Sequence, residues 1–498
     1  MSAIKTPLRV DVALFCLLLA LQSLSLPALA QQQDDTRRIL EQRNQVQAKD
    51  RERAIIQDQI DAGRPTMVVD GREYTVEHNA NDVGRALYLA LQNKQWSAVR
   101  YFLDEYLTLP DRDPLLVHYA QGAVARFAGD YVRAEREYRA LLQLKPDFLP
   151  GRLELARVLF EDQQNKEAGA LFGSIEDAID RNDPKTEGVL GSISSFRQAL
   201  AARDGWQGSF ALGPAWSDNV NRTSASSNCL IFLDGQCYFN RSTPEAVKSA
   251  GYEFDAALDR RWTLSGHHGL YLRSTLFGQG YRDHGAFNEL TSTTQAGYSY
   301  RSGRHAFALA PSFEYYALGN AALYGAGGLH TDWSWTISPV SLLKIEGDWK
   351  RMRYRRQDYA SYLDGDTASA YATYFRGFGE RATAFVGIDV LDSKAQDDAD
   401  GYFQRGVRLG GSLQWPSGFQ ATLFTSYRWR DYGAFSAILE ARRKDKEQGY
   451  TLILRAPRLA FSGFVPLLTF RRNQVESNID WLYSYDRNAI SLKFEHQF

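Results

Sequence analysis

The chain has 498 residues, of which 44% are hydrophobic, 13% aromatic and 23% charged. Its 58 basic and 59 acidic side chains nearly cancel, which argues against a nucleic-acid partner because phosphate binding needs a concentrated positive surface. The 27 Tyr, 27 Phe and 10 Trp exclude a chain that is disordered throughout. Beyond residue 30 no apolar run is long enough for a membrane-spanning helix, and the length predicts more than one domain.

Residues 1–30 have the pattern of a secretory signal peptide. Lys5 and Arg9 precede a short apolar stretch, and the segment ends in Ala-Leu-Ala. We therefore expect cleavage between Ala30 and Gln31. A membrane anchor is the alternative, but the stretch is short and a helix-breaking proline follows it.

Two cysteines, Cys229 and Cys237, would remain after cleavage. In an exported protein, an even pair at such a short separation predicts a disulfide that closes a small loop. Two cysteines without companion histidines do not make a zinc site.

The remaining chain divides into two parts of different composition. Residues 31–200 are rich in Ala, Leu, Arg, Glu and Gln with helical spacing, whereas residues 206–498 alternate apolar and polar positions. We interpret residues 31–80 as a polar helical arm and linker, with an exposed helix over 34–60. Residues 81–200 form a predicted helical repeat domain.

A period of about 34 residues with small side chains and an aromatic one helical turn later is the tetratricopeptide pattern. Residues expected to pack the paired helices are Ala98, Phe102, Gly122, Ala134, Tyr138, Ala156, Ala168 and Phe172. Gly129 and Asp130 are expected to form the turn of the middle repeat. A generic helical bundle would not explain this spacing. Stacked repeats expose a concave surface that is suited to binding a polypeptide.

The second part breaks into about fourteen alternating segments. They are expected near 206–218, 250–263, 267–281, 288–301, 304–317, 322–337, 341–354, 366–378, 380–392, 402–415, 418–431, 444–456, 461–475 and 482–498. In one of them Leu343, Ile345 and Trp349 alternate with charged residues. Such period-two segments, joined alternately by short and long connections, predict a transmembrane antiparallel β-barrel in an outer membrane.

An even number of strands places both ends of the barrel on one rim. The helical repeats would then lie in the periplasm with the tight turns, and the loop with the cysteines would face outside. The last strand ends in Phe498, which resembles the signal that the bacterial barrel-assembly machinery recognises. Outer-membrane lipid is a further expected partner, and periplasmic chaperones are possible partners.

No motif for catalysis is found, so no enzymatic activity, cofactor or metal is expected. His267 and His268 lie in a predicted short turn and are interpreted as solvated. The segment 397–401 resembles a calcium loop but lacks the ligand spacing and the closing glutamate. Opposite charges facing a barrel lumen are expected to form a polar wall.

Several segments resemble the surface lipoprotein assembly modulator (Slam) family, the translocons of type XI secretion. They are residues 75–88 at the start of the repeats, 146–150, 152–156 and 159–162 within them, 217–221 at the end of the first strand, and 477–480, 485, 487–488 and 498 at the end of the chain. The resemblance covers essentially all of the mature chain in the right order.

This resemblance implies a fourteen-stranded barrel that exports client proteins to the cell surface. The clients would be surface lipoproteins or related soluble haem- or metal-scavenging proteins, such as a secreted haemophore-like protein. Two other functions stay open: a polysaccharide exporter, which usually has many more repeats, and a simple porin-like channel, for which periplasmic repeats would be superfluous.

Overall fold

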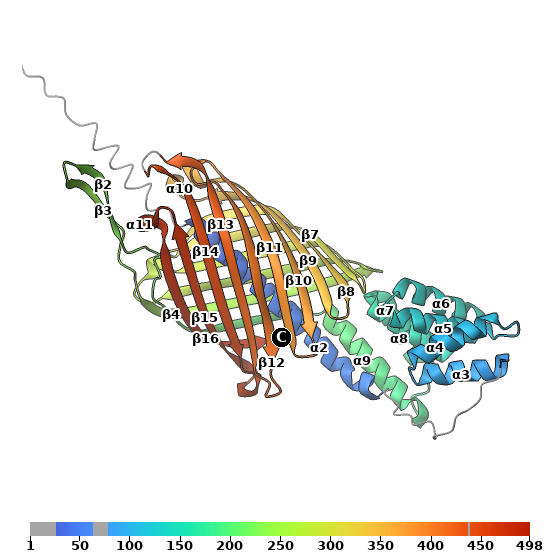
Figure 1. Cartoon of the computed structure of the whole chain (residues 1–498). Helices are drawn as coiled ribbons and strands as arrows, with labels where there is room; N and C mark the ends of the chain where they lie inside the picture. Colours follow the sequence, from blue (N-terminus) through green and yellow to red (C-terminus); the bar gives the residue numbers. More distant parts are fainter. Residues whose placement is uncertain (1–25, 63–77, 437–438) are drawn as a thin grey trace, which may run out of the picture.

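The computed structural model describes residues 26–62, 78–436 and 439–498. A helical part is followed by a closed antiparallel barrel, and helices α3 to α9 gather at one end of it (Figure 1). The predicted fold class is therefore confirmed. Residues 1–25 of the predicted signal peptide lie outside the described residues, and the expected cleavage point falls within the first described helix, α2 (Leu26–Ala62).

Within the described residues, fourteen strands close the barrel, as the sequence predicts, and each predicted segment overlaps one strand. The strands are β1 (Gln207–Ser217), β4 (Ser249–Ser265), β5 (His268–Tyr281), β6 (Glu289–Arg301), β7 (His305–Leu318), β8 (Ala321–Ser338), β9 (Ser341–Tyr354), β10 (Gly365–Phe378), β11 (Ala382–Ala395), β12 (Tyr402–Gln414), β13 (Gln420–Ser436), β14 (Ala441–Arg455), β15 (Phe464–Ser477) and β16 (Tyr485–Gln497). Short helices, α10 (Gln357–Leu363) and α11 (Asp480–Tyr483), lie in two of the connections. The first connection carries a separate hairpin, β2 (Ser227–Leu233) and β3 (Gln236–Ser242).

The two faces of the barrel meet different surroundings. On β11, Ile388 is 60% exposed while its neighbour Asp389 is 2% exposed. On β9, Ile345 and Trp349 point outward, and the alternate positions are buried charged residues. An apolar exterior and a charged interior are what an outer-membrane barrel requires, and this barrel spans an outer membrane.

The barrel closes where β1 meets β16. The Gly208 N–H donates to the Phe498 carbonyl at 3.0 Å, and the Phe498 N–H donates back to Gly208 at 3.1 Å. In the described part of the barrel every strand is paired on both sides, so no strand edge there is open to lipid, which could not satisfy its backbone groups. The β1–β16 register skips Gly213 and Pro214, whereas β1 pairs with β4 without interruption. Proline has no N–H to donate, so the ladder is weaker at this point of the seam.

The helical repeats are three antiparallel pairs followed by a long helix. The pairs are α3 (Ala80–Gln92) with α4 (Trp96–Thr108), α5 (Pro114–Phe127) with α6 (Tyr131–Leu144), and α7 (Leu149–Glu161) with α8 (Asn165–Ala178), and α9 (Glu187–Asp204) leads into β1. Asn79 and Asp113 cap the first helices of two pairs by accepting from backbone N–H groups. Gly129 adopts a φ of +70° in the turn, and Asp130 caps α6.

The residues that the repeat pattern singles out lie between the paired helices. Ala134, Ala156 and Ala168 are fully buried, as are the rings of Tyr138 and Phe172. A Cβ atom on Gly122 would lie 2.8 Å from the Tyr138 ring, so only glycine fits there without a shift. Ala98 and Phe102 are partly buried and pack against the core of the first pair.

The repeats sit on the rim that carries the tight turns. The Gly303 N–H donates to Asp162 at 3.0 Å, the Gly266 N–H donates to Glu167 at 2.8 Å, and Arg304 donates to the Ala128 carbonyl. The helical domain is therefore fixed at the periplasmic mouth of the barrel. Among the described residues, no helix is long and apolar enough to cross a membrane.

His267, in the turn between β4 and β5, makes a contact with the repeats that depends on its protonation. Its Nε2 lies 2.8 Å from an Asp162 carboxylate oxygen, so interpreting this turn as merely solvated is wrong for His267. The hydrogen bond that His267 donates to the Asp162 carboxylate raises the pKa of His267 above its usual value. Burial by itself raises the pKa of Asp162, but the hydrogen bonds from His267 and the Gly303 N–H outweigh it, and the pKa is lowered.

Replacing Gly122 by Ala should destabilise the repeats. The new methyl group collides with the buried Tyr138 ring, so we expect a loss of about 1–3 kcal/mol, less the helix-propensity gain of up to about 1 kcal/mol. Gly173→Ala in α8 is the matched control, because nothing lies within 4 Å of the added atom. The thermal stability of both variants is measured in detergent from the loss of the helical circular-dichroism signal as the temperature rises. Equal effects of the two substitutions would contradict this packing.

The His267–Asp162 contact should weaken as the pH rises. A histidine whose folded pKa is raised contributes stability that is present at low pH and is lost as the pH passes through that pKa. The Asp162 contribution is lost only in acid, since its pKa is lowered. We expect amide-exchange protection of Gly303, corrected for intrinsic rates, to fall between about pH 6 and 8. His267→Gln should abolish that dependence; an unchanged profile in the variant would refute it.

Candidate functional site: the barrel lumen and its periplasmic mouth

The lumen wall is lined with buried charged side chains of both signs. Those that carry the argument are Glu253, Asp255, Arg273, Glu314, His330, Asp332, Glu346, Asp348, Lys350, Asp389, Arg428, Lys493 and Glu495. Neighbouring strands pair some of them, as between His330 of β8 and Asp348 of β9 at 2.8 Å, and Lys493 reaches across β1 to Glu253 at 2.6 Å. The predicted polar wall is therefore present, and it is a network of ion pairs.

The lumen is occupied by the chain's own helix α2. Figure 1 shows α2 running through the barrel and emerging beside α9. The predicted helix over 34–60 is thus present, but the expectation of an exposed arm is wrong. Arg37 and Arg38 are 2% and 7% exposed, because the wall surrounds them on all sides.

Acidic residues in the first described turns of α2 meet basic residues of the wall. Asp35 accepts two hydrogen bonds from the Arg428 guanidinium, at 2.6 and 2.7 Å. Asp34 lies 3.3 Å from the Lys350 ammonium. Paired N–H groups of an arginine fit a carboxylate in both direction and spacing, so the Asp35 contact also fixes the rotation of the helix.

One turn further, the charges are reversed. Arg37 and Arg38 both reach Asp348, at 3.1 and 3.2 Å, and Arg38 also lies 3.0 Å from Glu346. The Arg38 guanidinium stacks 3.2 Å from the centre of the Tyr371 ring. The helix therefore matches the wall with acid on base first and base on acid next.

The second half of α2 continues this match and then leaves the barrel. Arg43 lies 2.5 Å from Asp255 of β4 and 3.1 Å from Glu495 of β16, the two strands that flank β1. Beyond the wall contacts, Glu52 accepts two hydrogen bonds from Arg203 of α9, at 2.7 and 3.0 Å. The helix is thus tied to the wall at several levels and to the helical domain below.

A cavity remains beside α2. Thr36, Ile39 and Leu40 of the helix line one side, and strands on both sides of the β1–β16 seam line the other. The cavity therefore lies between α2 and the wall around the seam, although Arg43 bridges to that wall.

The first helices of the repeat pairs form a second candidate surface. Helices α3, α5 and α7 contact one another in succession. Arg126 of α5 bridges Glu154 and Glu161 of α7, at 2.7 and 2.5 Å. Burial raises the pKa of Glu154, but Arg126 and Arg157 outweigh it and lower the pKa below its usual value.

Aromatic side chains lie on this same surface. Burial, with Glu154 and Tyr88 adding to it, raises the pKa of Tyr119 to about 12, so its hydroxyl stays neutral. Tyr88 of α3 is 48% exposed. An accessible ring beside fixed charges is suited to a polypeptide partner.

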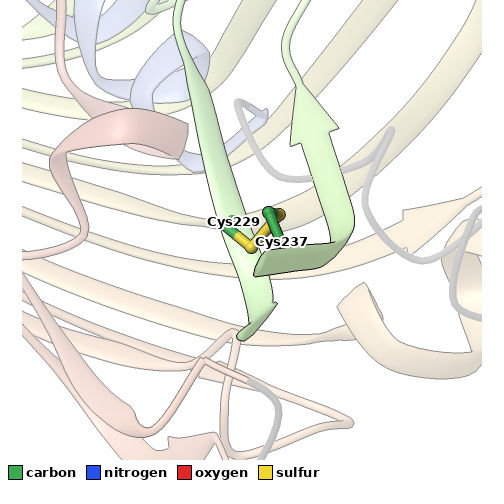
Figure 2. Close-up of a disulfide and its surroundings, with 2 residues drawn as sticks. All are labelled: Cys229 and Cys237. Atoms are coloured by element: carbon green, nitrogen blue, oxygen red, sulfur yellow. A yellow bond between two sulfur atoms is a disulfide. The ribbon is translucent and has the colours of Figure 1, made fainter. Parts of the chain in front are cut away.

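At the opposite end of the barrel, Cys229 and Cys237 form the predicted disulfide between β2 and β3 (Figure 2). Their Cα atoms are 5.8 Å apart, within the ordinary range. The bridge holds the hairpin together, since an isolated two-stranded sheet is only marginally stable.

The remaining sequence candidate, the loop 397–401, lies in the described part of the chain. No group of three or more His, Cys, Asp or Glu residues there could hold a metal ion. In the loop 397–401, an Asp397 oxygen accepts from the Ala399 N–H, and burial together with Asp397 raises the pKa of Asp400 to about 6. No pattern in the sequence indicates which lumen residues α2 contacts.

Known proteins place the chain in a family. Residues 206–498 match the model of the surface lipoprotein assembly modifiers, and residues 69–172 match the model of their N-terminal tetratricopeptide repeats. A hemophilin secretion modulator of Acinetobacter baumannii is 41% identical over 445 residues, which cover 87% of this chain and 89% of that protein.

More distant relatives carry the family name itself. Surface lipoprotein assembly modifiers of Pasteurella multocida and Neisseria meningitidis are 26% and 24% identical, over 83% and 91% of this chain and 82% and 90% of their own. Among solved structures, a Pseudomonas aeruginosa FadL homologue aligns with a TM-score of 0.35 and 10% identity, over 60% of this chain and 91% of its own. The family models together with the 41% identical relative establish that this chain belongs to the surface lipoprotein assembly modifiers.

Proposed function

We propose that this chain exports a client protein through the outer membrane, and that the client is a haem-binding protein of the hemophilin class. The 41% identity to a hemophilin secretion modulator carries this proposal, because it extends over nearly the whole of both chains. Identity to the relatives named for lipoproteins is 24–26%. A soluble haem-binding client is therefore preferred over a surface lipoprotein.

In this proposal the signal peptide is removed after Ala30, and the repeats hold the client at the periplasmic mouth. The surface of α3, α5 and α7 is the part of the repeats that we assign to the client. Its support is the exposed Tyr88 ring, the charged cluster around Arg126, and the position of the repeats on the rim.

The two alternative functions, a polysaccharide exporter and a porin-like channel, require different kinds of lumen. Sugar passage is favoured by a pore lined with stacked aromatic rings, whereas this wall is dominated by paired charges. A porin-like channel needs an open bore, whereas α2 occupies this one. Both observations favour protein export.

Co-expression with hemophilin of Acinetobacter baumannii in Escherichia coli tests the function. We expect hemophilin to reach the medium only when this chain is present, and a lipoprotein reporter of the same expression level to stay inside. The readout is immunoblotting of medium and periplasm. Hemophilin retained in the periplasm, with the barrel correctly folded, would count against the proposal.

Tyr88→Glu should reduce hemophilin release severalfold, because a charge replaces the exposed ring that we assign to client contact. Val132→Glu is the matched control, since Val132 of α6 is 73% exposed and lies on a second helix of a pair. Release is measured as the ratio of medium to periplasmic client. Equal loss in both variants, or in neither, would argue against this surface.

We also propose that the barrel-assembly machinery recognises Phe498 and inserts the barrel into outer-membrane lipid. Phe498→Ala keeps both backbone hydrogen bonds to Gly208, so closure itself is unaffected. The amount of heat-modifiable barrel in outer membranes should fall severalfold. Phe494→Ala, another exposed ring of the same strand, should have a much smaller effect; the reverse order would refute the role of the terminal residue.

A further inference from the structure

We infer that α2 is a displaceable plug, which closes the lumen in the resting protein and is released from it as a helix. This inference goes beyond client export, because it concerns the state of the barrel when no client is present. It follows from the position of α2, from the chemistry of its contacts, and from the partners that remain when those contacts are broken.

The contacts of α2 are charged and lie at successive levels of the lumen. Asp35 binds Arg428, Arg38 binds Glu346 and Asp348, and Arg43 binds Asp255 and Glu495. Ion pairs with this alternation of sign define one register, since a shift of one turn would bring like charges together. A helix held in this way occupies a specific position in the lumen.

The wall groups that hold α2 also have partners within the wall. Asp348 is bound by His330 at 2.8 Å, Lys350 by Glu314 at 2.7 Å, and Asp255 by Lys493 at 2.6 Å.

The same holds for the remaining wall groups. Glu346 is bound by Lys344, Glu495 by Arg455 and Arg428 by Asp389. Removing one partner of a buried ion pair is costly when the other charge is left alone. Each of these six wall groups keeps an ion-pair partner within the wall when α2 leaves the lumen. Water that enters the lumen can then solvate the parts of these groups that α2 had contacted.

The helix itself is built to exist outside the lumen. Along its described length, charged and amide side chains occur on every side, whereas a permanent core helix has an apolar stripe. Arg37 keeps an ion pair with Asp34 of its own helix at 3.4 Å. Release into water therefore exposes little apolar surface.

The lower end of α2 connects the plug to the repeats. Glu52 is bound by Arg203 of α9, and Phe196 of α9 stacks on Phe172 of α8 with ring centres 5.1 Å apart. Ile55 and Ile56 of α2 also pack against the core of the repeats, so a movement of the repeats is transmitted to α2 through this ion pair and this apolar contact.

Single-channel recording of the full-length protein in planar bilayers tests the plug without any client. The wild-type chain should be closed most of the time, and a variant lacking residues 33–62 should conduct steadily. Arg37→Gln with Arg38→Gln should raise the fraction of time in the open state by about tenfold or more, because the pairs with Asp348 and Glu346 are lost. Heat-modifiable migration on gels checks that each barrel is folded.

Lys49→Gln with Arg53→Gln is the matched control. Both cations are exposed on the same helix, and the charge change is identical, so the open fraction should stay at the wild-type level. Steady conduction by the wild-type chain would overturn the inference. So would equal open fractions in the two double variants.

A covalent lock separates movement of α2 from a change in the wall. Cysteines replacing Arg43 and Asp255, in the Arg37→Gln, Arg38→Gln background, can be joined by a short bismaleimide, while Cys229 and Cys237 are protected by their disulfide. Bridging should return the open fraction to the wild-type level. Openings that persist after complete bridging would show that α2 is not the moving part. Because current is the readout, a failure of client export leaves this result unaffected.

Discussion

A charge inside a membrane-spanning barrel must have a partner, and this requirement governs the whole of the lumen. Breaking a buried ion pair by removing one partner costs about 3–5 kcal/mol. The wall meets the requirement strand by strand, as where Lys493 lies between Glu253 and Asp255 at 2.6 Å from each. Helix α2 supplies several of the same wall charges with a second partner from inside the lumen. The interior is therefore satisfied with the helix present and remains largely satisfied without it.

The outer surface of the barrel was predictable because it depends on a local rule. Strand residues alternate between lipid and lumen, so the sequence around Ile345 and Trp349 shows both the strand and its orientation. The repeats were predictable for a similar reason, since a period of about 34 residues records one structural unit. The disulfide needed only two cysteines in an exported chain. In each case the relevant neighbours are close in the sequence or are repeated.

The position of α2 could not be predicted in that way. Its partners are roughly 200 to 450 residues away, and neither Arg38 nor Asp348 carries a local sign that they meet. A helix with charges on every side is usually solvent-exposed, and only the closed barrel supplies a buried environment that is itself charged. The His267–Asp162 contact could not be predicted for the same reason, since a histidine in a turn is solvated unless another domain covers it.

The tight turns of the periplasmic rim determine where the repeats bind the barrel. At the periplasmic rim the turns are tight, so the N–H groups of Gly266 and Gly303 are free of strand pairing and donate hydrogen bonds to carboxylates of the repeats. The repeats are thereby held beside the point where α2 leaves the lumen and meets Arg203. A passive pore has no use for a lumen helix that is bound to a separate domain. Because α2 contacts the repeats at the periplasmic mouth, a client bound to the repeats can affect the position of α2 in the lumen. The interrupted β1–β16 register at Gly213 and Pro214 and the cavity beside α2 both lie in the sector of the barrel around the seam, so a displacement of α2 would enlarge the space beside the weakest part of the wall.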